Sequence, residues 1–133
     1  MDGLLREDSE MEFWQVSVMD FNERKAVFIG IKTPEFRGEI IGDNYVVLGN
    51  LLARKETLTS MGKEFGSSCG KLAQRLAMAL KVEGESGGDK RGEKSAALIV
   101  VSSSEMEAEI KGDTHKNPID ELLRRSKALW EKE

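Results

Sequence analysis

GSSCGKLAQRLA, residues 66–77, runs from a glycine–serine loop directly into a helix. The leucines that follow recur at the spacing of one helical face, at Leu72, Leu76 and Leu80. A serine of the loop can accept hydrogen bonds from the first free N–H groups of the helix, and the glycines let the chain turn. The stretch predicts a helix over about 69–82 that buries its leucine face against a sheet.

The same stretch raises the question of nucleotide binding. A phosphate-binding loop follows a buried strand and reads G-x-x-x-x-G-K-[ST], so that backbone N–H groups hold the phosphates and the hydroxyl binds magnesium. Here only three residues separate Gly66 from Gly70, and Leu72 stands where the hydroxyl is required. A small nucleotide-binding protein is therefore the least favoured hypothesis.

Length and composition indicate one globular domain. The chain has 133 residues, of which 39% are hydrophobic and 33% charged. We expect a flexible N-terminal arm at 1–11 and a single α+β domain from 12 to 133. Within it, the glycine-rich segment at about 83–94 and the charged segment at 103–116 are predicted to be mobile loops.

Charge and hydropathy exclude several classes of protein. A net charge of -4 disfavours a nucleic-acid binder, which usually presents a basic face. The sequence contains no run of about 18 consecutive apolar residues, so no membrane association is expected. An acidic N-terminus without an apolar core is unlike a signal peptide, and the single Cys69 cannot form an internal disulfide. We expect the protein in the cytoplasm, with the nucleus as a further location.

The order of predicted elements gives the fold class. Strands are expected at 14–18, 26–31, 45–48, 57–61 and 95–102, with a loop at 35–43 between the second and the third. Helices are expected at 69–82 and from Asn117-Pro118 onward, where Asn can cap and Pro suits the first helical position. The pattern predicts an α+β fold: a mostly antiparallel five- to six-stranded sheet with two helices packed on one face.

Two of these strands are apolar on both faces, over residues 26–31 and 96–101. Such a strand has to be covered twice, and two helices can cover only one face of the sheet. An uncovered apolar face would be an aggregation hazard. We therefore expect an obligate interaction protein whose sheet meets a partner chain. The interface candidates are Phe28, Gly30, Tyr45 and Val47, with Phe28 favoured because an aromatic ring is a typical anchor.

The sequence offers no convincing set of catalytic residues. His115 lies in a charged segment without an implied partner, and Cys69 stands alone at a helix start. One Cys and one His do not make a zinc site. We expect no catalytic, cofactor-binding or metal-binding residues, and no enzyme.

The chain resembles the proteasome assembly chaperone family, most closely its fourth type and next its third. The segment LAQRLA at 72–77 carries most of the resemblance. It is supported by the opening hairpin, from Phe13-Trp14 to Phe21 and then AVFIG at 26–30, and by ALIVVS at 97–102 followed by a helix.

The resemblance implies a dedicated chaperone for assembly of the 20S proteasome. It implies a heterodimer with a homologous chaperone of the third type, contact with proteasome alpha subunits, alpha 5 in particular, and promotion of alpha-ring formation without chemistry. The alternative from another class is a homodimeric scaffold of the roadblock or longin kind, which uses a similar sheet with helices.

Overall fold

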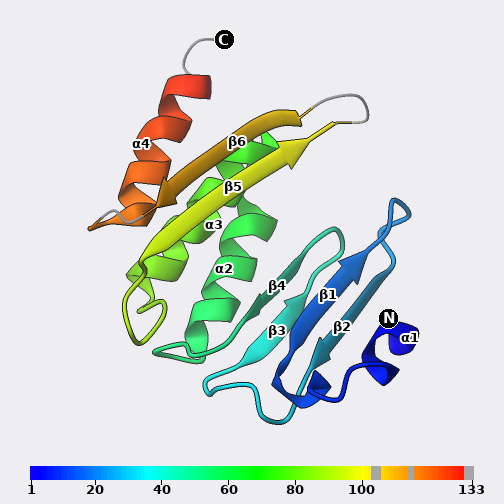
Figure 1. Ribbon diagram of the computed structural model, residues 1–133. Coiled ribbons are helices and arrows are strands. Elements are labelled where there is room, and N and C mark those ends of the chain that lie inside the picture. The colour runs from blue at the N-terminus through cyan, green and yellow to red at the C-terminus, as the bar shows by residue number, and fades with distance from the viewer. Residues whose placement is uncertain (103–105, 114–115, 131–133) are drawn as a thin grey trace.

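The computed structural model describes residues 1–102, 106–113 and 116–130 (Figure 1). The elements, in chain order, are α1 (Asp2–Arg6), the 3-10 turn η1 (Met11–Phe13), β1 (Gln15–Met19), β2 (Lys25–Ile29), β3 (Gly38–Ile41), β4 (Val46–Gly49), α2 (Glu56–Ser67), α3 (Leu72–Glu85), β5 (Ser95–Val101), β6 (Met106–Asp113) and α4 (Pro118–Trp130).

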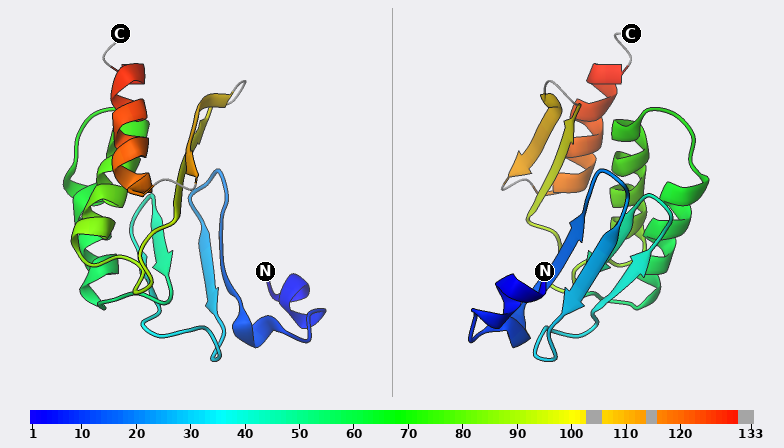
Figure 2. Two further views of the ribbon diagram at one scale, coloured as in Figure 1. Left: turned by 60° about the vertical axis from the view of Figure 1, so that its left-hand side comes forward. Right: turned by 90° about the vertical axis from the view of Figure 1, so that its right-hand side faces the viewer.

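The strands form three separate antiparallel hairpins. β1 pairs with β2, β3 with β4, and β5 with β6. The predicted single sheet of five to six strands with two helices is therefore wrong: the described residues form three two-stranded sheets and four α-helices. Figure 2 shows α2, α3 and α4 on one side of the hairpins, with β3–β4 lying between α2 and the β1–β2 hairpin.

The largest local error concerns residues 57–61, predicted as a strand, which form the start of α2. β-branched Thr57 and Thr59 suggested extended structure, but the residues buried in α2, namely Thr57, Leu58, Gly62 and Phe65, follow a helical period. The glycine has a packing reason. A Cβ on Gly62 would stand 3.1 Å from Ile40 Cγ2, so the helix lies close against β3.

The helix over residues 69–82 was predicted nearly correctly, but its buried face is different. α3 begins at Leu72, which is 47% exposed, while Ala77 and Ala79 are buried. Leu76 and Leu80 are partly buried against the core. Ala77 packs in the cluster that α3 shares with β5, β6 and α4, so a small residue, and not a leucine, is the most buried position of this helix.

Two hydrophobic clusters take the place of one core. The first joins α3, α4, β5 and β6 through Ala77, Leu98, Val100, Ile110 and Leu122. The second joins β4, α2 and the chain between them through Val47, Leu52 and Leu58, with Ile40, Tyr45 and Met61 packed against it. The three hairpins do not merge into one sheet, and each cluster lies under its own hairpin.

The glycine-rich segment predicted as a mobile loop at about 83–94 is tied down by hydrogen bonds. Ala53 N donates to Gly88 O at 2.8 Å, Lys90 N donates to Leu51 O at 2.9 Å, and Thr57 Oγ1 donates to Ser86 O at 3.2 Å. Gly87, Gly88 and Gly92 take positive φ, which other residues adopt at a cost. The glycines therefore shape a defined turn.

Two further expectations differ from the structure. Met106–Asp113, placed in the segment 103–116 that was predicted as a loop, forms strand β6, and Gly38–Ile41 within the predicted loop 35–43 forms β3. In the predicted arm at 1–11, Asp2–Arg6 form the short helix α1, which has no buried residue. No helix in the described part of the chain has the length and apolar character needed to cross a membrane.

Candidate functional site

An apolar groove of about 440 Å³ lies between the β3–β4 hairpin and β5. Its floor consists of α2, through Met61 and Phe65, and of α3, through Leu76, Ala79 and Leu80. One wall is Tyr45 with residues 46–48 of β4, and the other is Ala97, Leu98 and Ile99 of β5. Ser17 of β1 completes the lining. The groove thus separates the two hydrophobic clusters.

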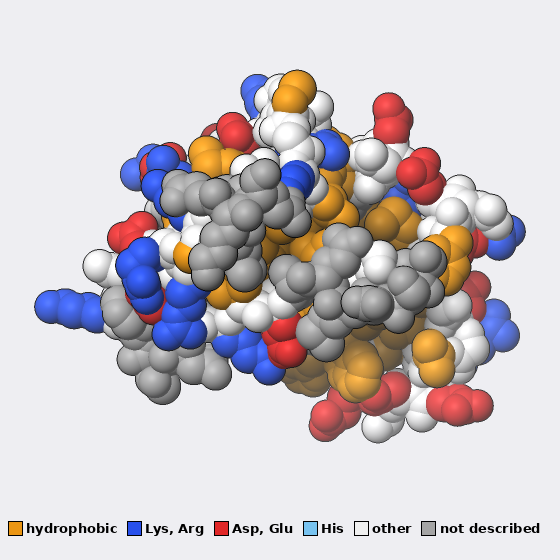
Figure 3. All heavy atoms as spheres, turned by 90° about the horizontal axis from the view of Figure 1, so that it is seen from above, with side chains coloured by type: hydrophobic (Ala, Val, Ile, Leu, Met, Phe, Trp, Pro, Cys, Tyr) orange, Lys and Arg blue, Asp and Glu red, His pale blue; other side chains and the backbone are white. Residues whose placement is uncertain are grey.

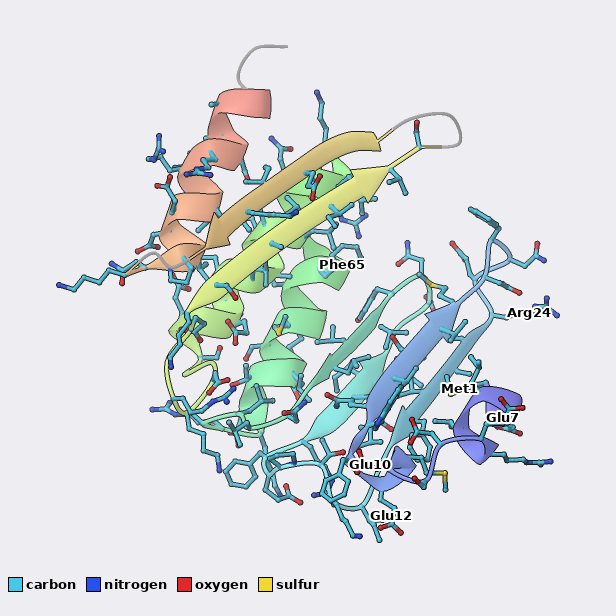
Figure 4. All side chains as sticks on the ribbon, in the orientation of Figure 1. Met1, Glu7, Glu10, Glu12, Arg24 and Phe65 are labelled. Carbon is cyan, nitrogen blue, oxygen red and sulfur yellow. The ribbon has the colours of Figure 1, made fainter. Side chains whose placement is uncertain are left out.

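An aromatic pair shapes the floor at one end. The rings of Tyr45 and Phe65 meet edge to face, with centroids 5.2 Å apart. The guanidinium of Arg75 lies 4.2 Å from the centroid of the Phe65 ring and donates through Nη2 to Phe65 O at 2.9 Å. Figure 4 places Phe65 on the side of α2 that faces the space between β5 and the other hairpins. The floor is therefore held in place by contacts between α2 and α3.

The two faces of β5 differ in what covers them. Leu98 and Val100 point toward the helices and are buried, whereas Ile99 and Val101 are 55% and 65% exposed. On the neighbouring β6, the exposed residues Glu109 and Lys111 form an ion pair at 2.6 Å. The outer face is therefore apolar on β5, beside the groove, and charged on β6.

The surface view agrees with an apolar region bordered by charges. Seen from above, Figure 3 shows hydrophobic side chains between and beside the residues drawn in grey, with Lys, Arg, Asp and Glu side chains mostly toward the edge of the view. An apolar patch with a polar rim is typical of a surface that meets another polypeptide.

A second pocket, of about 460 Å³, holds a group of carboxylates where α3 meets the loop before β5. Burial raises the pKa of Glu83 to about 7, and the nearby charges of Glu93 and Asp89 add to the effect. Asp89 behaves in the opposite way, because its hydrogen bond to Arg91 lowers its pKa. A carboxyl group that titrates near neutrality is able to exchange protons at physiological pH.

The carboxylates of this pocket make hydrogen bonds that stabilise the loop between α3 and β5. Glu93 Oε1 accepts a hydrogen bond from Asp89 N at 3.1 Å, and Asp89 Oδ1 accepts one from Arg91 N at 2.8 Å. Gly88 lies directly against the Glu93 carboxylate, where a Cβ would clash. The carboxylates thus hold the turn between α3 and β5, and we assign them a structural role.

The four residues predicted as interface fall in different places. Tyr45 and Val47 both line the groove, where Val47 is buried. Phe28 is half-buried on β2, opposite Val16, and is not among the groove residues. Gly30 is buried, and a Cβ there would overlap the backbone of Glu12. Whether any of the four meets a partner remains a prediction.

Sequence reasoning missed the groove residues of α2. Met61 was assigned to a strand and Phe65 to no predicted element, so their shared helical face was overlooked. Ile99 was recognised as part of a two-sided apolar strand, and that signal was correct. What no pattern indicated was that β4 and β5 would stand apart.

The predicted loop at 66–70 does not have the setting of a phosphate-binding loop. It connects two helices, whereas a phosphate-binding loop follows a strand. Gly70 has φ +113, and Gln74 Oε1 accepts a hydrogen bond from Lys71 N at the start of α3. Cys69 is free and exposed. His115 lies outside the described residues, among which no group of three or more His, Cys, Asp or Glu is placed to hold a metal ion.

Comparison with known proteins overturns the resemblance to proteasome assembly chaperones. The model of a family of unknown function, DUF1028, matches residues 1–122. The resemblance rested on short apolar segments, such as LAQRLA, that many helices and strands share, whereas the family model spans most of the chain. No curated protein matches.

A solved structure supports the same conclusion. The crystal structure of protein SPO2555 from Silicibacter pomeroyi, also matched to DUF1028, is similar to this chain with a TM-score of 0.85 and 25% sequence identity. The similarity covers 98% of this chain and 55% of that one, so this chain spans about half the length of its relative. The chain belongs to DUF1028, a family of unknown function.

Proposed function

We propose that this chain is a protein-binding module that receives another polypeptide in the groove between β4 and β5. The observation that carries the proposal is an apolar groove whose wall continues onto the exposed outer face of β5 at Ile99. Burial of such surface is the main favourable term in protein association. In this role the chain binds and performs no chemistry of its own.

Of the expectations drawn from the sequence, the proposal keeps binding to a partner through an apolar strand, and it drops the role in proteasome assembly. Of the two apolar strands predicted to need a second cover, at 26–31 and 96–101, the second is β5, whose outer face is exposed at Ile99 and Val101. A role in proteasome assembly rested on the resemblance to the chaperone family, and we do not carry it forward. The specific chaperone partners named for that role are left aside with it.

The test compares what the groove captures with what the rest of the surface captures. The chain is immobilised and exposed to an extract of its own source cells, and the bound proteins are identified by mass spectrometry. Ile99→Lys, which places a charge in the groove wall, is compared with Val101→Lys on the same face of the same strand but outside the groove.

We expect a partner that is retained by the wild-type chain and by Val101→Lys and lost with Ile99→Lys. Both substitutions are at exposed positions, so both variants should fold, and circular dichroism checks this. Identical sets of proteins on all three baits would refute binding through the groove.

A further inference from the structure

We infer that the natural occupant of the groove is an extended strand, supplied by polypeptide of the kind that SPO2555 carries beyond the region matched by this chain. This inference rests on the proposed function and names the partner of the same groove. Four observations support it: the unpaired edges of β4 and β5, the division of the core into two hydrophobic clusters, the exposed apolar face of β5, and the greater length of SPO2555.

Each wall of the groove contains a strand that has one edge without a partner strand. Each described strand pairs with only one other, so β4 is bonded to β3 alone and β5 to β6 alone. The edges that border the groove therefore present backbone N–H and C=O groups that another strand can pair with. A helix in the same place would leave these groups unpaired.

The split core indicates that the occupant has to be apolar. Val47 of the groove wall belongs to one hydrophobic cluster and Leu98 of the opposite wall to the other. Side chains pointing from an inserted strand toward Met61 and Leu76 would contact residues packed against each cluster and join the two into one core. An inserted polar strand would instead bury hydrogen-bonding groups without partners.

The outer face of β5 indicates that the strand is apolar on its other side as well. Ile99 is exposed on that face, beside the groove, so alternate side chains of a neighbouring strand would pack against it. We therefore expect the occupant to be a continuous apolar run, rich in β-branched and aromatic residues.

A second copy of this chain fits the groove less well. One strand that a copy could offer is β6, whose free edge lies on the side away from β5. Its exposed face carries the ion pair of Glu109 and Lys111. Placed in the groove, that face would bring charged side chains beside the apolar side chain of Ile99.

The length of the relative supplies a source for the strand. SPO2555 shares this framework with a TM-score of 0.85, yet this chain accounts for only 55% of it. The remainder of that chain is polypeptide without a counterpart in residues 1–133, and it has to pack somewhere. An apolar groove between two open strand edges is a suitable place for one of its strands.

The experiment co-expresses residues 1–133, carrying an affinity tag, with the part of SPO2555 that lies outside the matched region. Size-exclusion chromatography with light scattering gives the stoichiometry of what the tag recovers. Hydrogen exchange then compares the amides of β4 and β5 in the complex and in the chain alone. Wild type, Ile99→Lys and the control Val101→Lys are treated alike.

We expect a one-to-one complex that Val101→Lys retains and that Ile99→Lys weakens at least tenfold. We also expect amide exchange in Val46–Gly49 and Ser95–Val101 to slow by at least tenfold on binding, because an added strand would bond to those edges. Recovery of no complex, or of one that Ile99→Lys leaves intact, would overturn the inference.

Two outcomes separate this inference from the proposed function. A groove-dependent partner found in the extract, together with no binding of the SPO2555 segment, would sustain the binding role and reject the strand source. A dimer of this chain that Ile99→Lys disrupts would likewise sustain a binding groove, and its occupant would then be a second copy.

Discussion

Glu83 combines partial burial with like charges close by, and the result is a pKa of about 7. An unfolded chain would return the carboxyl to its ordinary value of 4.5. The folded protein therefore binds the proton more tightly than the unfolded chain does. The contribution of Glu83 to stability is greatest below pH 4.5 and falls as the pH rises from there through about 7.

The substitution Glu83→Gln removes this dependence, since the amide cannot ionise and can donate to the Glu93 carboxylate. We expect equal melting temperatures for wild type and variant at pH 4.5, and a higher one for the variant at pH 8. Thermal unfolding at several pH values measures the difference. Glu85→Gln, at the end of the same helix, controls for the loss of one negative charge.

A constant difference between Glu83→Gln and wild type across the pH range would show that Glu83 is not the titrating group. A lower melting temperature of the variant at pH 8 would show that the carboxylate form is the one that the loop needs. Either result would change the structural role assigned to this pocket.

Helix α4 is the element whose packing is most sensitive to one side chain. Leu122 is completely buried in the cluster that α4 shares with α3, β5 and β6. Leu122→Ala should reduce the free energy of unfolding by about 2–5 kcal/mol, because it removes buried methyl groups and leaves a cavity. Urea unfolding followed by circular dichroism measures this change.

Leu72 at the start of α3 is the matched control, because the same substitution there affects a side chain that is 47% exposed. Leu72→Ala should change stability by no more than about 0.5 kcal/mol. If the two substitutions cost the same, the buried face of the helical layer has been assigned incorrectly.

Elements with a strong and uniform signal could be predicted from sequence, and those that depend on neighbours could not. The apolar run of β5 and the Asn-Pro start of α4 are local signals, and both elements form where expected. Residues 57–61 read as a strand because threonine favours one, but Leu58 and Phe65 find apolar partners only if the segment is helical. Tertiary packing determines that this segment is helical, and the local sequence pattern does not indicate it.

The sequence predicted the apolar character of the candidate site, but it did not predict where on the fold the site lies. The two-sided apolar strand at 96–101 does leave Ile99 and Val101 exposed, and Tyr45 and Val47 of the predicted set do line the groove. Whether a partner covers that surface stays a prediction. Phe28 was favoured on ring size alone, and it lies on a different hairpin. The gap between β4 and β5 results from how the hairpins pack on the helices, which sequence spacing does not encode.

At the scale of the whole molecule, one side chain joins two of the hairpins. Gln15 Nε2 of β1 donates to Gly38 O of β3 at 3.1 Å and to Gly49 O of β4 at 2.9 Å. Its Oε1 accepts a hydrogen bond from Asn50 Nδ2 at 3.0 Å. Every polar atom of this amide is therefore used to hold β1–β2 against β3–β4.

Gln15→Glu should separate these hairpins, because a carboxylate has the same shape but cannot donate and would face two carbonyl oxygens. We expect the free energy of unfolding to fall by about 2 kcal/mol at pH 7. Chemical denaturation measures the loss, and faster amide exchange confined to β1 and β2 would localise it.

Gln74→Glu serves as the control, because it makes the same chemical change where the side chain acts only as acceptor. Gln74 Oε1 accepts from Lys71 N at the beginning of α3, and a carboxylate is favourable there. Equal losses from the two substitutions would show that the charge itself, and not the bridge between hairpins, is responsible.

We expect the attachment through Gln15 also to affect how quickly an incoming strand can enter the groove. Ser17, two residues further along β1, lines the groove, so a brief swing of the β1–β2 hairpin would open a side entrance. The rest of the fold could stay intact while this happens. The rate of association would then depend on the motion of one hairpin. Because this motion does not require the whole chain to unfold, association could be fast even in a very stable protein.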